Sequence, residues 1–153
     1  HTCPNCGVKL GDTHLTGCPS RFHYSIHYSK WKSDVALFPI SITRFSAVEA
    51  SKELFKESGV VSSLHHIVQL KPFSPSQEAL NNLSTARYGG IVLDDDYPDG
   101  TAKALALDLH NLTGARMEVL GLEDRTAGFS PQTDNLPPGK DRIKAFIKRL
   151  MTV

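Results

Sequence analysis

Cysteine and histidine side chains near the start of the chain have the types and spacing that suit a zinc ion. Two cysteines separated by two residues, with a glycine after the second, let one turn present two thiolates to the same tetrahedral metal. A third cysteine follows, and a histidine on either side of it can complete the site. The expected zinc ligands are Cys3, Cys6 and Cys18, together with either His14 or His23.

Four aspartates gather directly after an aliphatic run that is typical of a buried strand. They are Asp94, Asp95, Asp96 and Asp99. Carboxylate oxygens are the ligands that Mg²⁺ prefers, so an independent Mg²⁺ enzyme is one alternative. However, neighbouring side chains on a strand point to opposite faces and cannot all reach one ion unless the strand has ended. The preferred interpretation is a turn whose carboxylates cap the following helix and favour its dipole.

Two further groups of side chains could bind a ligand. His65 and His66 lie on a predicted strand and face opposite sides, so at most one can meet a given ligand, and a surface or core role is preferred. Aromatic and polar residues also alternate between positions 23 and 31, where they could stack on bases or, in the preferred interpretation, pack on a neighbouring domain. That group comprises His23, Tyr24, His27, Tyr28, Lys30 and Trp31.

Composition limits the class of protein. A chain of 153 residues can bury one ordinary core, so one domain with an appendage is expected. Its formal net charge of +1 gives no long-range field to attract nucleic acid, which is not expected as a partner. No apolar run approaches the roughly 20 residues that span a bilayer, so no membrane partner is expected. Because the cysteines are odd in number and clustered, we expect a reducing, cytoplasmic compartment.

The arrangement of elements predicts an α/β fold. Residues 1–33 are predicted to form the zinc-binding appendage, and from residue 34 to 153 short aliphatic runs alternate with helical patterns, as in a mostly parallel sheet with crossover helices. Ser46 and Glu49 have the spacing of a capping box. Strands are predicted at 35–42, 63–70, 90–94 and 116–122, and helices at 46–56, 76–83, 101–112 and around Ile143, Phe146, Ile147 and Leu150.

The connection between the last predicted strand and the last helix is long. Residues 123–139 are rich in Pro, Asn and Asp, and ordered loops of this length are often functional. Such a loop could dock on a partner, with Phe129 as an apolar anchor and Arg125 as a charged contact. A plain surface excursion is the alternative.

The sequence resembles the C-terminal domain of the transketolase superfamily, which includes the beta subunits of 2-oxo acid dehydrogenases. The likeness covers roughly residues 34–152 and rests on the order of four stretches rather than on any one of them. These are Ala47-Val-Glu-Ala50, Gln69-Leu-Lys-Pro72-Phe73, Gly89-Gly-Ile-Val-Leu-Asp-Asp-Asp96 with Gly100, and Val119-Leu-Gly-Leu-Glu-Asp124.

The resemblance implies a three-layer sandwich around a mostly parallel sheet with one antiparallel edge strand. It also implies a subunit of a split thiamine-diphosphate-dependent enzyme that is not active alone. Thiamine diphosphate and Mg²⁺ would enter only in a hetero-oligomer, held by partner subunits that carry the diphosphate-binding and pyrimidine-binding domains. The alternative is a zinc-containing module that binds protein or nucleic acid and uses the α/β domain as a scaffold.

Overall fold

The computed structural model describes residues 25–26 and 32–152, which fold around one five-stranded sheet. The strands are β1 (Ser25–Ile26), β2 (Val35–Pro39), β3 (Ser62–His65), β4 (Gly90–Leu93) and β5 (Met117–Leu120), in the order β1-β3-β2-β4-β5. All pairs are parallel except β1 with β3. This confirms the predicted mostly parallel sheet, and β1 supplies the antiparallel edge that the resemblance implies.

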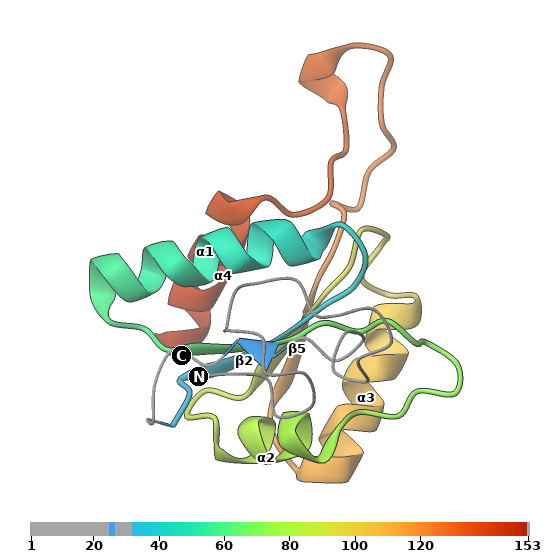
Figure 1. The fold of residues 1–153 in the computed structure, drawn as a ribbon. Coiled ribbons are helices and arrows are strands. Elements are labelled where there is room, and N and C mark those ends of the chain that lie inside the picture. Colours follow the sequence, from blue (N-terminus) through green and yellow to red (C-terminus); the bar gives the residue numbers. More distant parts are fainter. Residues whose placement is uncertain (1–24, 27–31, 153) are drawn as a thin grey trace, which may run out of the picture.

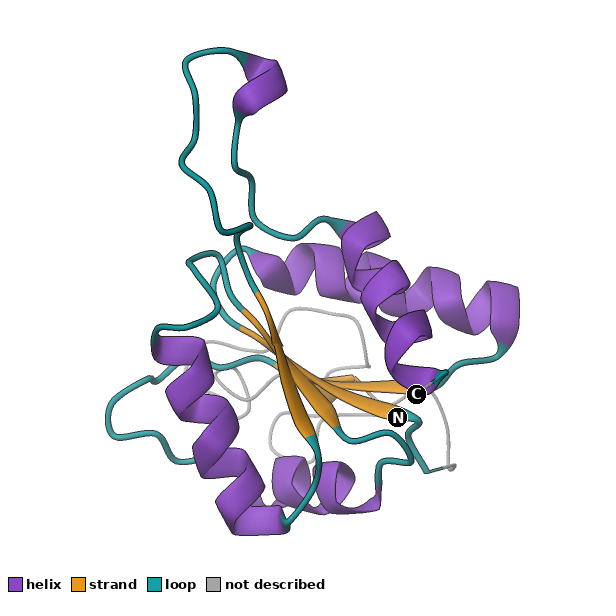
Figure 2. Ribbon diagram, turned by 180° about the vertical axis from the view of Figure 1, so that it is seen from behind, coloured by secondary structure: helices purple, strands orange, loops and turns teal. Residues whose placement is uncertain are grey.

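Helices cover both faces of the sheet, as Figures 1 and 2 show. They are α1 (Thr43–Ser58), α2 (Gln77–Thr85), α3 (Thr101–Thr113) and α4 (Lys140–Met151), with a 3₁₀ turn at Pro131–Thr133. Helices α1 and α4 pack together on one face, and α2 and α3 lie on the other. The result is the expected three-layer α/β sandwich.

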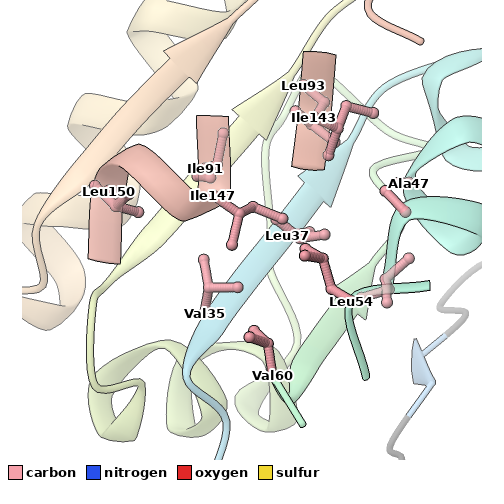
Figure 3. Close-up of a cluster of buried hydrophobic side chains, with 12 residues drawn as sticks. Val35, Leu37, Ala47, Leu54, Val60, Ile91, Leu93, Ile143, Ile147 and Leu150 are labelled. Carbon is pink, nitrogen blue, oxygen red and sulfur yellow. The ribbon is translucent and has the colours of Figure 1, made fainter. Parts of the chain in front are cut away.

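Alternation along the two central strands divides the core into two layers, because successive side chains point to opposite faces. Val35 and Leu37 of β2 face α1 and α4, whereas Ala36 and Phe38 face α2 and α3. Figure 3 shows the first layer, in which Ile147 of α4 lies beside Leu37 and Ile143 beside Leu93. Both helix residues are fully buried, so the predicted apolar stripe of the last helix is confirmed.

All four predicted strands are shorter than expected, and the two largest differences lie at carboxyl ends. β2 ends at Pro39 rather than at residue 42, and β3 ends at His65 rather than at residue 70. Pro39 is tolerated in a central strand because its missing amide donor falls at the last residue, while its carbonyl still accepts from Ile67 N at 3.0 Å. After His65 only one further bridge, between Ile40 and Ile67, continues the ladder.

The predicted capping box is wrong. Helix α1 begins at Thr43, three residues before Ser46, and its N-cap Ile42 makes no side-chain capping bond. The hydroxyl of Thr43 instead donates to the carbonyl of Ile40 at 2.6 Å. Helices α1 and α3 end one or two residues beyond the predicted 56 and 112, where Gly59 (φ 68°) and Gly114 (φ 73°) adopt the left-handed conformation that closes a helix.

Candidate functional site at the carboxyl edge of the sheet

The carboxyl ends of β2 and β4 form a topological switch point. The chain leaves β2 toward α1 on one face of the sheet and leaves β4 toward α3 on the opposite face. Crevices at such points are the usual ligand sites of open α/β sheets. Here the buried hydroxyl of Thr43 links the two strand ends, lying 2.6 Å from the carbonyl oxygen of Ile40 and 3.2 Å from that of Leu93. The polar groups that face solvent at this edge come from the loops that follow the strands.

The acidic turn after β4 is the first of these loops. Asp94 is buried, with 4% of its surface exposed, and its Oδ1 accepts from the amide of Asp96 at 3.3 Å. Burial raises the pKa of Asp94, and a hydrogen bond with the Asp95 side chain raises that pKa further. Asp96 turns outward and accepts from the amide of Tyr97 at 2.7 Å. The three consecutive carboxylates thus occupy different environments.

These positions correct the capping interpretation of the aspartates. The N-cap of α3 is Gly100, which makes no side-chain capping bond, and the first turn of the helix holds no acidic residue. The carboxylates therefore do not cap α3 through their side chains. Within residues 25–26 and 32–152, no three His, Cys, Asp or Glu side chains are grouped so that they could hold a metal ion.

The two histidines at the end of β3, His65 within the strand and His66 after it, also differ in environment. His65 is buried, with its ring centroid 5.3 Å from that of Phe38. His66 is half-buried, and its pKa is lowered by burial and then by the charge of Arg44. The pair forms no common site, as the alternation along a strand predicted.

A projecting arm, defined as residues 123–138, rises from the end of β5 beside the acidic turn (Figures 1 and 2). Its base is held by hydrogen bonds across its two limbs. The amide of Glu123 donates to Asn135 Oδ1 at 3.2 Å, and Asn135 Nδ2 donates to the carbonyls of Glu123 at 2.8 Å and Arg125 at 2.6 Å. The Tyr97 hydroxyl donates to the same Arg125 carbonyl at 2.9 Å, so the acidic turn and the arm are joined.

Arg125 belongs to this base. Its Nε donates to Glu123 at 2.7 Å, and its guanidinium also donates to the Asp134 carbonyl at 2.6 Å. The guanidinium is thus engaged inside the arm, while 42% of the Arg125 side chain stays exposed, so its role as a charged contact for a partner stays a prediction. The acidic residue Glu123, two positions before Arg125 in the sequence, indicated that the guanidinium could form an ion pair within the loop.

Gly121 lets β5 approach the acidic turn closely. A Cβ at this position would collide with the carbonyl oxygen of Asp96. The amide of Leu122 donates to that carbonyl at 3.0 Å, and the Gly121 carbonyl accepts from the Arg142 guanidinium at 3.0 Å. The root of the arm is therefore fixed both to β4 and to α4.

Large apolar side chains are exposed on the arm and around its foot. The Phe129 side chain is fully exposed, and Leu136 is 67% exposed. Ile42 and Phe45, at the start of α1, are 57% and 59% exposed, and the Arg44 guanidinium lies 4.5 Å from the Phe45 ring centroid. The carboxyl edge therefore carries unburied apolar surface, which often marks a protein interface. Phe129 was predicted as an apolar anchor from its place in a long loop, whereas Ile42 and Phe45 were not predicted, although they lie outside the buried stripe of α1.

The expected zinc ligands Cys3, Cys6, Cys18, His14 and His23 lie outside the residues that the structure describes. The aromatic group between positions 23 and 31 also falls there, apart from Ser25 and Ile26 in β1. Among the helices described, none has the length and apolar composition needed to cross a membrane.

Comparison with known proteins identifies relatives by fold alone. No family model and no curated protein matches the sequence. A split gene transketolase, solved as an inactive beta4 tetramer, matches with a TM-score of 0.68 and 17% identity over 95% of this chain and 47% of its own. A 2-oxoglutarate:ferredoxin oxidoreductase from Magnetococcus marinus, solved with 2-oxoglutarate, coenzyme A and succinyl-CoA bound, matches with a TM-score of 0.59 and 17% identity over 84% of this chain and 20% of its own. These likenesses support a transketolase-like C-terminal domain fold.

Proposed function

We propose that this chain is a subunit of a split thiamine-diphosphate-dependent enzyme with transketolase-like or 2-oxo acid dehydrogenase-like chemistry. The observation that carries the proposal is the match to a split gene transketolase, which takes in 95% of this chain but only 47% of the other. The matched part corresponds to one domain, and we assign the remaining domains of such an enzyme to partner chains. The expected assembly is a hetero-oligomer.

Thiamine diphosphate and Mg²⁺ are assigned to the partner chains. At the ends of β2 and β4, the buried Thr43 hydroxyl already contacts two carbonyl oxygens. The thiazolium of the cofactor supplies the carbanion chemistry in such enzymes. This chain would shape and seal the active-site entrance, and alone it should be inactive.

The carboxyl edge is the surface that we assign to the partner chains. The arm is tied at its base by hydrogen bonds to its own main chain, so it is ordered before binding, which lowers the entropy cost of association. Phe129 offers an aromatic anchor, and aromatic side chains are frequent hot spots of protein interfaces. Ile42 and Phe45 extend the apolar surface toward α1.

We further propose that residues 1–33 form a zinc-binding segment preceding the 34–153 domain. The support is the sequence spacing of Cys3, Cys6 and Cys18 with His14 or His23. In the alternative function, a zinc-containing interaction module, the same arm would bind a protein unrelated to thiamine diphosphate chemistry. Binding of thiamine diphosphate by the purified complex distinguishes the split enzyme from the interaction module.

Calorimetry with thiamine diphosphate and Mg²⁺ tests the proposal. The complex purified through a tag on this chain should bind the cofactor, and the isolated chain should not. A complex that binds no thiamine diphosphate would support the interaction module instead.

A further inference from the structure

Strand β5 has a neighbour on one side only among the described strands, since it ends the order β1-β3-β2-β4-β5. The carbonyls of Arg116 and Leu120 accept from Gly90 N at 2.9 Å and Asp94 N at 3.0 Å, so they point toward β4. Because backbone groups alternate along a strand, those of Met117 and Val119 point away from the sheet. Figure 2 shows β5 running into the arm at this edge. The edge can accept another strand.

An open apolar groove lies beside this edge, between β5 and α3. Ala104 and Leu107 of α3 and Met117 and Val119 of β5 contribute to its lining. Leu107, at the middle of α3, is 58% exposed although it faces this groove. A partner that pairs with β5 would therefore also meet an apolar helix face.

We propose that this face binds a second copy of the chain, with the two β5 strands antiparallel and Met117 opposite Met117 on the two-fold axis. In this register Arg116 of each copy stands opposite Glu118 of the other. Their side chains lie on the same face of β5 and already contact one another within the chain at 2.8 Å, with 47% and 38% of each exposed. Two copies would thus form an alternating group of two guanidinium and two carboxylate groups.

Charge distinguishes this register from its neighbours. Moving the axis by one residue places Glu118 directly opposite Glu118, and like charges in opposed positions destabilise strand pairing. Moving it by two residues places Glu118 opposite Leu120 and leaves both copies without a cross-strand ion pair. The register on Met117 also brings the two α3 helices side by side near Leu107, since this residue and Met117 border the same groove. The surface is self-complementary, as a two-fold interface requires.

Sedimentation equilibrium of the full chain tests the pairing, and charge reversal makes the test specific. The wild-type chain should have twice the mass of one chain at tens of micromolar. Arg116→Glu should raise the dissociation constant about tenfold or more, because it sets four carboxylates together. The double variant Arg116→Glu/Glu118→Arg restores the alternating charges and should return the dissociation constant to near the wild-type value.

A matched pair on α3 tests the groove. Leu107 and Leu112 are both 58% exposed, but only Leu107 lines the groove. Leu107→Lys should weaken the dimer, and Leu112→Lys should not. Hydrogen exchange should slow at the amides of Met117 and Val119 as the concentration rises. A chain that stays monomeric, or a dimer that tolerates both Arg116→Glu and Leu107→Lys, would overturn the proposal. Neither result would bear on binding to cofactor-carrying chains through the carboxyl edge.

Discussion

Asn135 and Glu123 lie 12 residues apart and exchange two hydrogen bonds, from the Glu123 amide to Asn135 Oδ1 at 3.2 Å and from Asn135 Nδ2 to the Glu123 carbonyl at 2.8 Å. This pair closes the base of the arm and allows its tip, with Phe129, to project without a core of its own. The hydrogen bonds at the base therefore hold the whole arm in its conformation.

Asn135→Ala should open the arm and leave the α/β body folded. Each lost hydrogen bond contributes about 1 kcal/mol, so chymotrypsin should cut after Phe129 at least about tenfold faster than in the wild type. Circular dichroism should show unchanged helix content. Asn111→Ala, at an exposed position on α3, is the control. Equal cleavage rates in the two variants would contradict the assigned role of Asn135.

Phe129→Ser should separate folding from assembly. The side chain is fully exposed, so the thermal midpoint should stay within about 1–2 °C of the wild type. Loss of an aromatic anchor should weaken binding to the partner chain by about tenfold or more. Leu112→Ser, at an exposed position on α3, should change neither quantity. Unchanged affinity for the partner would remove the arm from the proposed interface.

Asp94→Asn should stabilise the chain at neutral pH. Burial raises the pKa of Asp94 above its ordinary 3.8, so the folded state favours the neutral acid. The resulting stabilisation is present below pH 3.8 and is lost as the pH rises through the folded pKa. The variant should therefore melt a few degrees higher than the wild type at pH 7, and this difference should vanish near pH 3.8. Asp99→Asn, at an exposed site, should show no such rise; a variant at Asp94 that melts lower at pH 7 would refute the account.

Glu53→Gln should reveal the ion pairs that join α1 to α4. Hydrogen bonds from Lys140 at 2.8 Å and Lys144 at 2.9 Å lower the pKa of Glu53 from 4.5 to about 2. A lowered pKa gives stability that is present above pH 4.5 and lost as the pH falls toward 2. The melting difference between wild type and variant should be small, constant above pH 4.5, and closed by pH 2. It should shrink in high salt.

Glu49→Gln, on the exposed side of the same helix, is the matched control. It should lack this pH dependence, because Glu53 accepts both lysine hydrogen bonds. Identical pH profiles for the two variants would show that the ion pairs do not contribute.

Metal analysis tests the proposed zinc segment. The purified chain should hold about one zinc per chain, and a Cys3→Ser/Cys6→Ser variant should hold none. Single His14→Ala and His23→Ala variants should lose zinc unequally, which identifies the fourth ligand. A metal-free wild-type chain, prepared without chelator, would exclude the site.

The helix and sheet layers of the fold were predictable because buried apolar residues recur in the sequence at the regular spacing of a helix or a strand. Ala47, Ala50 and Leu54 are buried at the positions that a helical stripe predicts. The ends of elements were less predictable where tertiary contacts decide them. Residues 66–70 were predicted as part of a strand, yet β2 beside them has ended at Pro39, so among the described residues the ladder continues only through the Ile40–Ile67 bridge.

The candidate site was predictable only in part. An exposed Phe129 in a long loop could be expected, but the bonds of Asn135 depend on how two limbs of the arm meet. Likewise, three adjacent aspartates suggested a cap or a metal site, whereas the path of the turn buries Asp94 and turns Asp96 outward. Two-residue strands such as β1 leave almost no pattern in a sequence.

Native mass spectrometry of the complex purified from its own cells through this chain tests the central proposal most directly. It should detect this chain bound to at least one different chain, together with thiamine diphosphate and a divalent cation in the same assembly. A chain found only alone, or only with copies of itself, would contradict the proposal that it completes a split thiamine-diphosphate-dependent enzyme.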